Sequence, residues 1–173
     1  MAIEKALSIR GWMTEPELWW LAIQASSRKK IVELGSYYGR STRAIGDNTP
    51  GIVYAVDHFN GPADVSLLEF ERTSIWPIFS KNLSDLIASG KVVPIKTNHE
   101  QFDPPNDDFD MIFIDGDHRY EATKRDIKRW IGKCRKPALI SGHDYSHPGV
   151  RQAVNECFTD INIFEEIWSI WII

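Results

Sequence analysis

The stretch Ile31-Val32-Glu33-Leu34-Gly35-Ser36-Tyr37-Tyr38-Gly39 decides the fold that we expect for this chain. A short apolar run that ends in glycine is typical of a buried strand followed by a tight turn. Four more apolar runs, each bounded by turn residues or charges, lie at residues 52–56, 92–95, 111–114 and 138–140. Stretches with helical periodicity separate several of them. This alternation predicts an α/β fold with a doubly wound, mainly parallel sheet of the Rossmann-like type.

The two ends of the chain extend this prediction. Thr14 and Glu17 form a capping box, and the apolar periodicity that follows predicts a helix over residues 14–27. Residues 161–173 contain no glycine or proline and predict a final antiparallel pair of strands. Together with the five parallel strands, this pair makes a seven-stranded sheet with an antiparallel C-terminal strand. The long connection over residues 58–91 is a candidate lid.

Length and charge set limits on the class of protein. A chain of 173 residues fits a single domain over residues 1–173. The formal net charge of −4 gives no global positive field, so we expect neither nucleic acid nor an anionic membrane as a partner. Basic residues cluster over residues 124–136, where we expect a solvated helix face. We find no export signal and no apolar run of membrane-spanning length, which favours a cytoplasmic protein.

The loop after the first strand discriminates between cofactors. A dinucleotide site requires Gly-x-Gly-x-x-Gly, whereas this loop has Gly35-x-x-x-Gly39 with the bulky Tyr37 in place of the second glycine. Close approach of a pyrophosphate is therefore disfavoured. An acid at the strand end, Glu33, suits a ligand that carries an ammonium group and a ribose without phosphates. S-adenosylmethionine is such a ligand.

Asp57 stands at the end of the second predicted strand. A carboxylate at this position can accept hydrogen bonds from both hydroxyls of a ribose. The alternative is an acid that only stabilises a turn at the strand end.

The segment Asp110-Met-Ile-Phe-Ile-Asp115-Gly-Asp-His118-Arg-Tyr-Glu121 resembles a known signature. It is similar to the FIDGDHxYE motif of the small-molecule O-methyltransferase branch that includes macrocin O-methyltransferase-like proteins. This branch belongs to the class I S-adenosylmethionine-dependent methyltransferases. The segment Gly142-His143-Asp144-Tyr145 adds to the resemblance, which spans residues 29–171.

The resemblance implies roles for residues at the carboxyl ends of the strands. The loop residues that would surround the methionine end of the cofactor are Glu33, Gly35, Ser36, Gly39 and Ser41. Asp57 would hold the ribose, with His58 beside it. The adenine would lie near Asn98, His99 and Glu100, although a plain surface loop is the alternative for these three residues.

Methyl transfer to oxygen needs an acceptor hydroxyl that loses its proton. In catechol-type relatives, acids after the fourth and fifth strands hold Mg²⁺, and the corresponding residues here are Asp115, His143 and Asp144. His143 departs from the acidic pattern, and its imidazole favours Mn²⁺, Fe²⁺ or Zn²⁺ over Mg²⁺. Alternatively, the two acids only orient loops. His118 is a candidate general base, with a structural histidine as the alternative.

We therefore predict an enzyme that methylates a hydroxyl of a small molecule and uses Asp115 and His118 in catalysis. One rival is a metal-dependent hydrolase or oxygenase that uses Asp115, His118, His143 and Asp144. A second rival is a cofactor-binding domain without catalysis. Trp12 and other tryptophans could line an acceptor pocket, form a dimer contact or pack in the core. The sequence leaves open whether the chain forms a homo-oligomer.

Overall fold

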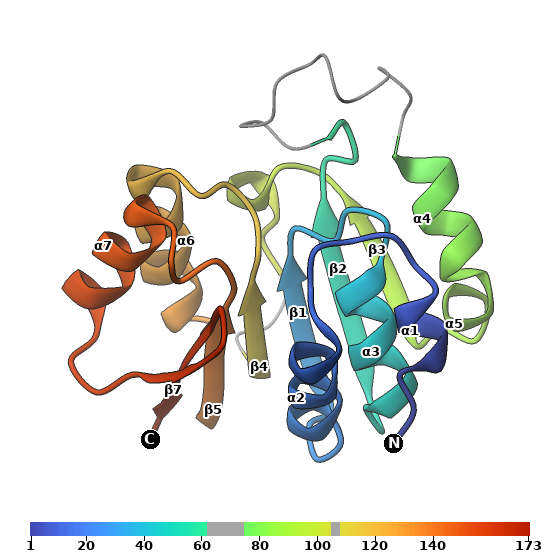
Figure 1. Cartoon of the computed structure of the whole chain (residues 1–173), viewed down its shortest axis with the longest axis horizontal. Coiled ribbons are helices and arrows are strands. Elements are labelled where there is room, and N and C mark those ends of the chain that lie inside the picture. The colour runs from blue at the N-terminus through green and yellow to red at the C-terminus, as the bar shows by residue number, and fades with distance from the viewer. Residues whose placement is uncertain (62–74, 105–107) are drawn as a thin grey trace.

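The computed structural model describes residues 1–61, 75–104 and 108–173 (Figure 1). Part of the predicted lid, residues 62–74, lies outside the described residues. Seven strands form one sheet in the order β3-β2-β1-β4-β5-β7-β6. The strands are β1 (Lys30–Leu34), β2 (Ile52–Asp57), β3 (Val92–Lys96), β4 (Phe109–Ile114), β5 (Cys134–Gly142), β6 (Asn162–Phe164) and β7 (Ile167–Ile172).

The pairing of the strands confirms the predicted fold class. β1 pairs in parallel with both β2 and β4, β2 pairs in parallel with β3, and β4 pairs in parallel with β5. β7 is antiparallel to β5 and to β6. The carboxyl ends of the five parallel strands therefore meet at one edge of the sheet, where ligands bind in folds of this kind.

Helices cover both faces of the sheet (Figure 1). They are α1 (Glu4–Leu7), α2 (Glu15–Ala25), α3 (Arg40–Asn48), α4 (Trp76–Asn82), α5 (Ser84–Ala88), α6 (Tyr120–Ile131) and α7 (Pro148–Cys157), with a 3-10 turn η1 (His99–Gln101) after β3. Neighbouring residues of a strand point to opposite faces. Ile31 thus packs in the core under helices α1 to α5, and Val32 packs in the core under α6 and α7. Burial on both faces explains why the parallel strands read as continuous apolar runs.

The predicted N-terminal helix is present as α2. The Thr14 side chain accepts a hydrogen bond from the backbone N–H of Glu17, and the Glu17 carboxylate accepts one from the backbone N–H of Thr14. This reciprocal capping satisfies two amide groups that the first helical turn leaves without partners.

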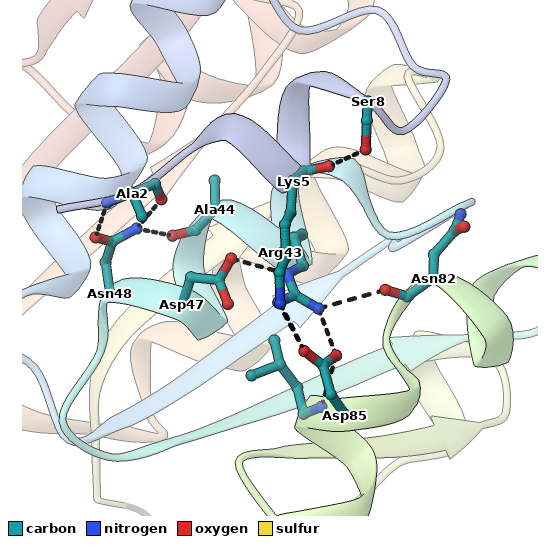
Figure 2. Close-up of polar contacts among 10 residues, drawn as sticks. Ala2, Lys5, Ser8, Arg43, Ala44, Asp47, Asn48, Asn82 and Asp85 are labelled. Carbon is teal, nitrogen blue, oxygen red and sulfur yellow. Dashed lines mark hydrogen bonds and ion pairs between the residues drawn. The ribbon is translucent and has the colours of Figure 1, made fainter.

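The short helix α1 precedes α2 and was not apparent in the sequence. Figure 2 shows how it is tied to its neighbours. Ala2 exchanges two backbone hydrogen bonds with the Asn48 side chain of α3, at 2.9 and 2.7 Å. Lys5 pairs with Asp85 of α5 at 2.9 Å, and Asp85 also forms a two-bond pair with Arg43 of α3. These contacts fix the start of the chain against α3 and α5.

The described part of the 58–91 connection contains α4 and α5. The Trp76-Pro77 pair marks a break in the sequence pattern, yet it begins α4, because proline is accepted in the first turn of a helix. Within the described residues, none of the helices has the length and apolar character needed to cross a membrane.

Candidate active site

A cavity of about 960 Å³ opens at the carboxyl ends of the parallel strands. The loops after β1, β2, β3, β4 and β5 contribute to its lining. Residues 10–13, which connect α1 to α2, complete it, and we call this segment the N-terminal wall. The cavity lies within the size range of small-molecule sites.

The loop between β1 and α3 is held by close backbone contacts. Gly35 has φ 90°, and a Cβ atom at this position would lie 2.0 Å from the carbonyl oxygen of Asp115. Any other residue would therefore separate the loop from the end of β4. Tyr37 also adopts a positive φ, 46°, which is unusual for a large side chain. The loop is thus fixed in a conformation that brings its backbone against the end of β4.

Asp57 organises this loop from the end of β2. Its Oδ2 atom accepts hydrogen bonds from the backbone N–H groups of Ser36 and Tyr37, both at 2.9 Å. Its Oδ1 atom accepts one from the N–H of Phe59 at 2.6 Å. An ionised carboxylate offers about four acceptor positions, so one stays available on the side of the cavity.

Glu33 lies beneath the same loop and does not line the cavity. Its Oε2 atom accepts hydrogen bonds from the hydroxyls of Ser36, at 2.6 Å, and Thr42. Burial raises the pKa of Glu33 to about 7, although the hydroxyls of Ser36, Ser41 and Thr42 oppose the rise. The Oε1 atom is buried and has no hydrogen-bond partner among the described residues. This orphaned acceptor fits a cationic group of a ligand in the loop above it.

The proposed adenine side is built by η1 and α6. Asn98, His99 and Glu100 all line the cavity. His99 Nδ1 lies 3.2 Å from Asp126 Oδ2, and the imidazole packs against Gly116, where a Cβ atom would meet His99 Cε1 at 2.4 Å. This contact places the His99 ring against the loop after β4.

Three potential metal ligands converge after β4 and β5. Asp115, His118 and Asp144 each offer one ligand atom, and these atoms lie within 4.8 Å of one another. His118 Nε2 is 3.0 Å from Asp144 Oδ2. Burial raises the pKa of Asp115 to about 6, with a further rise from the negative charge of Asp144. A set of two carboxylates and one imidazole suits Mn²⁺, Fe²⁺ or Zn²⁺ better than Mg²⁺.

His143, which the sequence places among the metal ligands, has a different set of partners. Its Nε2 atom lies 3.0 Å from Glu17 Oε1, and its Nδ1 atom lies 3.2 Å from Asp144 Oδ2. Both ring nitrogens thus face carboxylates. Burial opposes the charged imidazole, but Asp144, Glu17 and Asp115 together raise the pKa of His143 to about 11. His143 is therefore an imidazolium that joins α2 to the end of β5.

Glu17 was not singled out as a site residue. Its side chain is almost fully buried, with 1% exposed. Burial acts to raise its pKa, but hydrogen bonds to His143 and Thr14 outweigh burial and bring the pKa to about 2. Glu17 Oε1 also accepts the backbone N–H of Glu166, which precedes β7, at 3.1 Å. The capping box was visible in the sequence, but nothing in the sequence linked it to His143.

The structure brings most of the predicted site residues into the cavity. Those that line it are Gly35, Ser36, Ser41, Asp57, His58, Asn98, Asp115, His118, His143 and Asp144. Glu33 and Gly39 do not line it and instead shape the loop. Gly39 begins α3 with φ 89° and packs so closely that a Cβ atom would meet Leu83 at 2.2 Å.

The sequence matches a family model described as a methyltransferase domain over residues 32–145. The chain belongs to this family. The matched region runs from β1 to the loop after β5 and so contains every predicted site residue. No curated protein matches the sequence of this methyltransferase.

Solved structures share the fold at low sequence identity. A protein from Klebsiella pneumoniae assigned as an O-methyltransferase has a TM-score of 0.70 and 16% identity, with 98% of this chain and 87% of that chain covered. An O-methyltransferase from Bacillus cereus in complex with S-adenosylhomocysteine has a TM-score of 0.67 and 14% identity, covering 96% and 89%. A tRNA (m1A58) methyltransferase from Aquifex aeolicus has a TM-score of 0.68 and 13% identity, covering 94% and 62%. These likenesses establish the fold, which enzymes with different acceptors share.

Proposed function

We propose that this methyltransferase uses S-adenosylmethionine to methylate a hydroxyl group of a small molecule. One observation carries the proposal. A single cavity joins the loop that Asp57 organises to the Asp115–His118–Asp144 cluster at the ends of the neighbouring strands β4 and β5. The loop held by Asp57 fits the cofactor, and the Asp115–His118–Asp144 cluster fits an acceptor hydroxyl that must lose a proton. Transfer requires these two groups to share one space.

On the side of the cavity formed by the loops after β1, β2 and β3, residues are present that would contact each part of S-adenosylmethionine. When bound, this cofactor supplies a methyl group on a sulfonium centre. The available acceptor position of Asp57 would take a ribose hydroxyl. The hydroxyls of Ser36 and Ser41 would face the ammonium group, and the buried carboxyl of Glu33 would lie beneath them. Asn98 and His99 would lie beside the adenine.

His118 is placed to remove the proton of the acceptor. When His118 Nε2 donates a hydrogen bond to Asp144 Oδ2, the Nδ1 atom carries the lone pair and can accept a proton. Asp144 then holds the tautomer and stabilises the imidazolium that forms. Asp115 shares the lining of the cavity with His118 and adds negative charge that favours the same cation.

A divalent metal is an additional proposal at the same cluster. Asp115, His118 and Asp144 would hold it, and the ion would lower the pKa of a bound acceptor hydroxyl. Both ring nitrogens of His143 face carboxylates, Nδ1 that of Asp144 and Nε2 that of Glu17. His143 would therefore position Asp144 rather than bind the metal itself. This arrangement replaces the set of ligands that the sequence suggested.

A small-molecule acceptor agrees with the distribution of basic residues. On and after α6, most of them form ion pairs with acids, such as Lys124 with Glu156 and Lys133 with Asp103. Arg125 likewise lies 3.3 Å from Glu100. Charges compensated in this way offer little to a phosphate backbone.

Calorimetric titration with S-adenosylhomocysteine tests the cofactor. We expect saturable binding by the wild-type protein and weaker binding by Asp57→Ala. Transfer of a labelled methyl group from S-adenosylmethionine to a panel of phenols and sugars tests the reaction. Absence of cofactor binding contradicts the proposal. Cofactor binding without transfer to any acceptor would favour a cofactor-binding domain without catalysis.

Removal of metal separates the two catalytic proposals. If His118 acts alone, treatment with a chelator leaves the rate unchanged, and His118→Gln abolishes transfer. If a metal takes part, the chelator abolishes transfer and Mn²⁺ restores it. Tight metal binding without affinity for S-adenosylhomocysteine would instead favour a metal-dependent hydrolase or oxygenase.

A further inference from the structure

The N-terminal wall, residues 10–13, is held against the cavity by Arg40. The Arg40 guanidinium donates hydrogen bonds to the carbonyls of Met13 at 3.0 Å, Leu7 at 3.0 Å and Ile9 at 2.6 Å. Gly11 allows the close contact, because a Cβ atom there would lie 2.8 Å from Arg40 Cδ. The first residue of α3 therefore fixes the path of the wall.

Both ends of the wall are anchored as well. On the side of α1, the contacts of Ala2 and Lys5 with α3 and α5 hold the chain in place (Figure 2). On the other side, Met13 is buried in the core and Thr14 caps α2. Contacts within the chain thus hold the wall in place, so binding of a ligand would cost little conformational entropy.

The wall carries the positive charge of Arg10, which forms no ion pair with an acid in the described part of the chain. Other arginines of the cavity are paired, for example Arg119 with Asp117 and Arg125 with Glu100. Arg10 lines the cavity and makes no hydrogen bond or ion pair with the residues that the structure describes. Arg40 binds only backbone carbonyls in that part of the chain. A negatively charged group at the wall would therefore meet charge that the described residues leave without an ion pair.

An aromatic surface lines the same cavity as Arg10. The Trp12 side chain lines the cavity with 67% of its area exposed. Its ring centroid is 5.0 Å from that of Tyr37, which stacks on Tyr38 at 4.0 Å. Exposed tryptophan next to an arginine is a combination typical of ligand and interface sites.

We propose that the N-terminal wall binds a carboxylate in the cavity and that Arg10 is its recognition residue. This inference rests on the proposed function, because two sources of a carboxylate follow from it. The group can belong to the methionine end of the cofactor or to an acceptor whose body contacts Trp12. The planar guanidinium of arginine matches a carboxylate through two parallel hydrogen bonds.

The test compares wild type with Arg10→Gln and with the control Arg135→Gln. Arg135 is 63% exposed and lies at the amino end of β5, at the edge of the sheet opposite the cavity, so the control makes the same change of charge elsewhere. Arg10 makes no hydrogen bond or ion pair within the described part of the chain, so we expect Arg10→Gln to unfold at the wild-type temperature. The two probes for the cofactor are S-adenosylhomocysteine and 5′-methylthioadenosine, which lacks the carboxylate.

In the cofactor arm, Arg10→Gln would lower the affinity for S-adenosylhomocysteine by about tenfold or more and leave the affinity for 5′-methylthioadenosine unchanged. In the acceptor arm, 3,4-dihydroxybenzoate and its methyl ester are titrated into protein saturated with S-adenosylhomocysteine. There, the wild type would prefer the acid by about tenfold, and Arg10→Gln would lose the preference.

A loss confined to one arm supports the inference and names the source of the carboxylate. Equal binding by wild type and Arg10→Gln in both arms, including no binding of either acceptor probe, overturns it. If S-adenosylhomocysteine does not bind wild type at all, the proposed function fails. The inference is then decided by 3,4-dihydroxybenzoate and its ester on the free protein, where lack of an Arg10-dependent preference overturns it.

Discussion

The two sides of the cavity are built in different ways. On the cofactor side, Asp57 and Glu33 bind amides and hydroxyls of one continuous segment, residues 36–42, together with Phe59. On the other side, Glu17 of α2, His143 after β5 and the backbone of Glu166 meet from distant parts of the chain. Local segments can be recognised in a sequence, whereas a cluster of distant residues exists only after folding.

The two sides also contain buried carboxylates with opposite properties. Glu33 has neutral donors around it, and burial raises its pKa to about 7. Glu17 faces an imidazolium, which with the Thr14 contacts brings its pKa to about 2 despite burial. The same side chain thus favours its protonated form on one side of the cavity and its ionised form on the other.

The largest expected effect is that of removing the Glu17 side chain. Glu17→Ala leaves the His143 imidazolium buried without its partner and removes the cap of α2. We expect a loss of about 3–5 kcal/mol in the free energy of unfolding, measured by urea titration. Glu15→Ala, an exposed change in the same helical turn, is the matched control. Equal stability of the two variants would contradict the ion pair that joins α2 to β5.

The next effect is a pH dependence of opposite sign for the two carboxylates. Because the folded pKa of Glu33 is raised, its contribution to stability is present below pH 4.5 and is lost as the pH rises through 7, by about 3 kcal/mol. Because the folded pKa of Glu17 is lowered, its contribution is present above pH 4.5 and is lost as the pH falls toward 2.

Urea titrations from pH 4.5 to 8 isolate the contribution of Glu33, because the contribution of Glu17 changes only below pH 4.5. Glu33→Gln should reduce the decline in stability that wild type shows as the pH rises by about 3 kcal/mol, and the raised pKa values of Asp115 and His143 leave a smaller decline. Glu17→Gln should keep the contribution of Glu33. An unchanged slope in Glu33→Gln would show that Glu33 is ionised in the folded protein throughout this range.

A smaller effect is expected on cofactor binding from Asp57→Asn. The variant keeps the shape of the side chain but loses the charge that the Ser36 and Tyr37 amides contact. We expect the affinity for S-adenosylhomocysteine to fall by about 10- to 100-fold. The exposed change Asp160→Asn should leave the affinity at the wild-type value in the same calorimetric titration. If Asp57→Asn bound S-adenosylhomocysteine with the wild-type affinity, the ribose would not bind at Asp57.

The smallest effect on stability should come from Trp12→Ala. The side chain is 67% exposed, so its removal should change the free energy of unfolding by less than about 0.5 kcal/mol. Trp130→Ala, at a fully buried tryptophan, should cost about 3–5 kcal/mol. A large loss in Trp12→Ala would show that the N-terminal wall depends on this ring for its structure rather than offering it to a ligand.

The sheet was predictable because its strands carry their own signal. The run at residues 52–56 corresponds to β2, and the final antiparallel pair appears as β6 and β7. The helix α1 was missed because four residues hold no periodicity, and its position depends on Asn48 and Asp85. The start of α4 was missed because a proline inside a helical turn reads as a break.

The sequence by itself determined the strands, the glycine turn after β1 and the acids at the strand ends, because short apolar runs and turn residues act within a few positions. Only the tertiary structure decided that Glu33 lies beneath its loop, that His143 pairs with Glu17, and that Arg10 reaches the cavity. These arrangements depend on side chains far apart in the chain, whose contacts arise when α2 and the N-terminal wall pack against the ends of the strands.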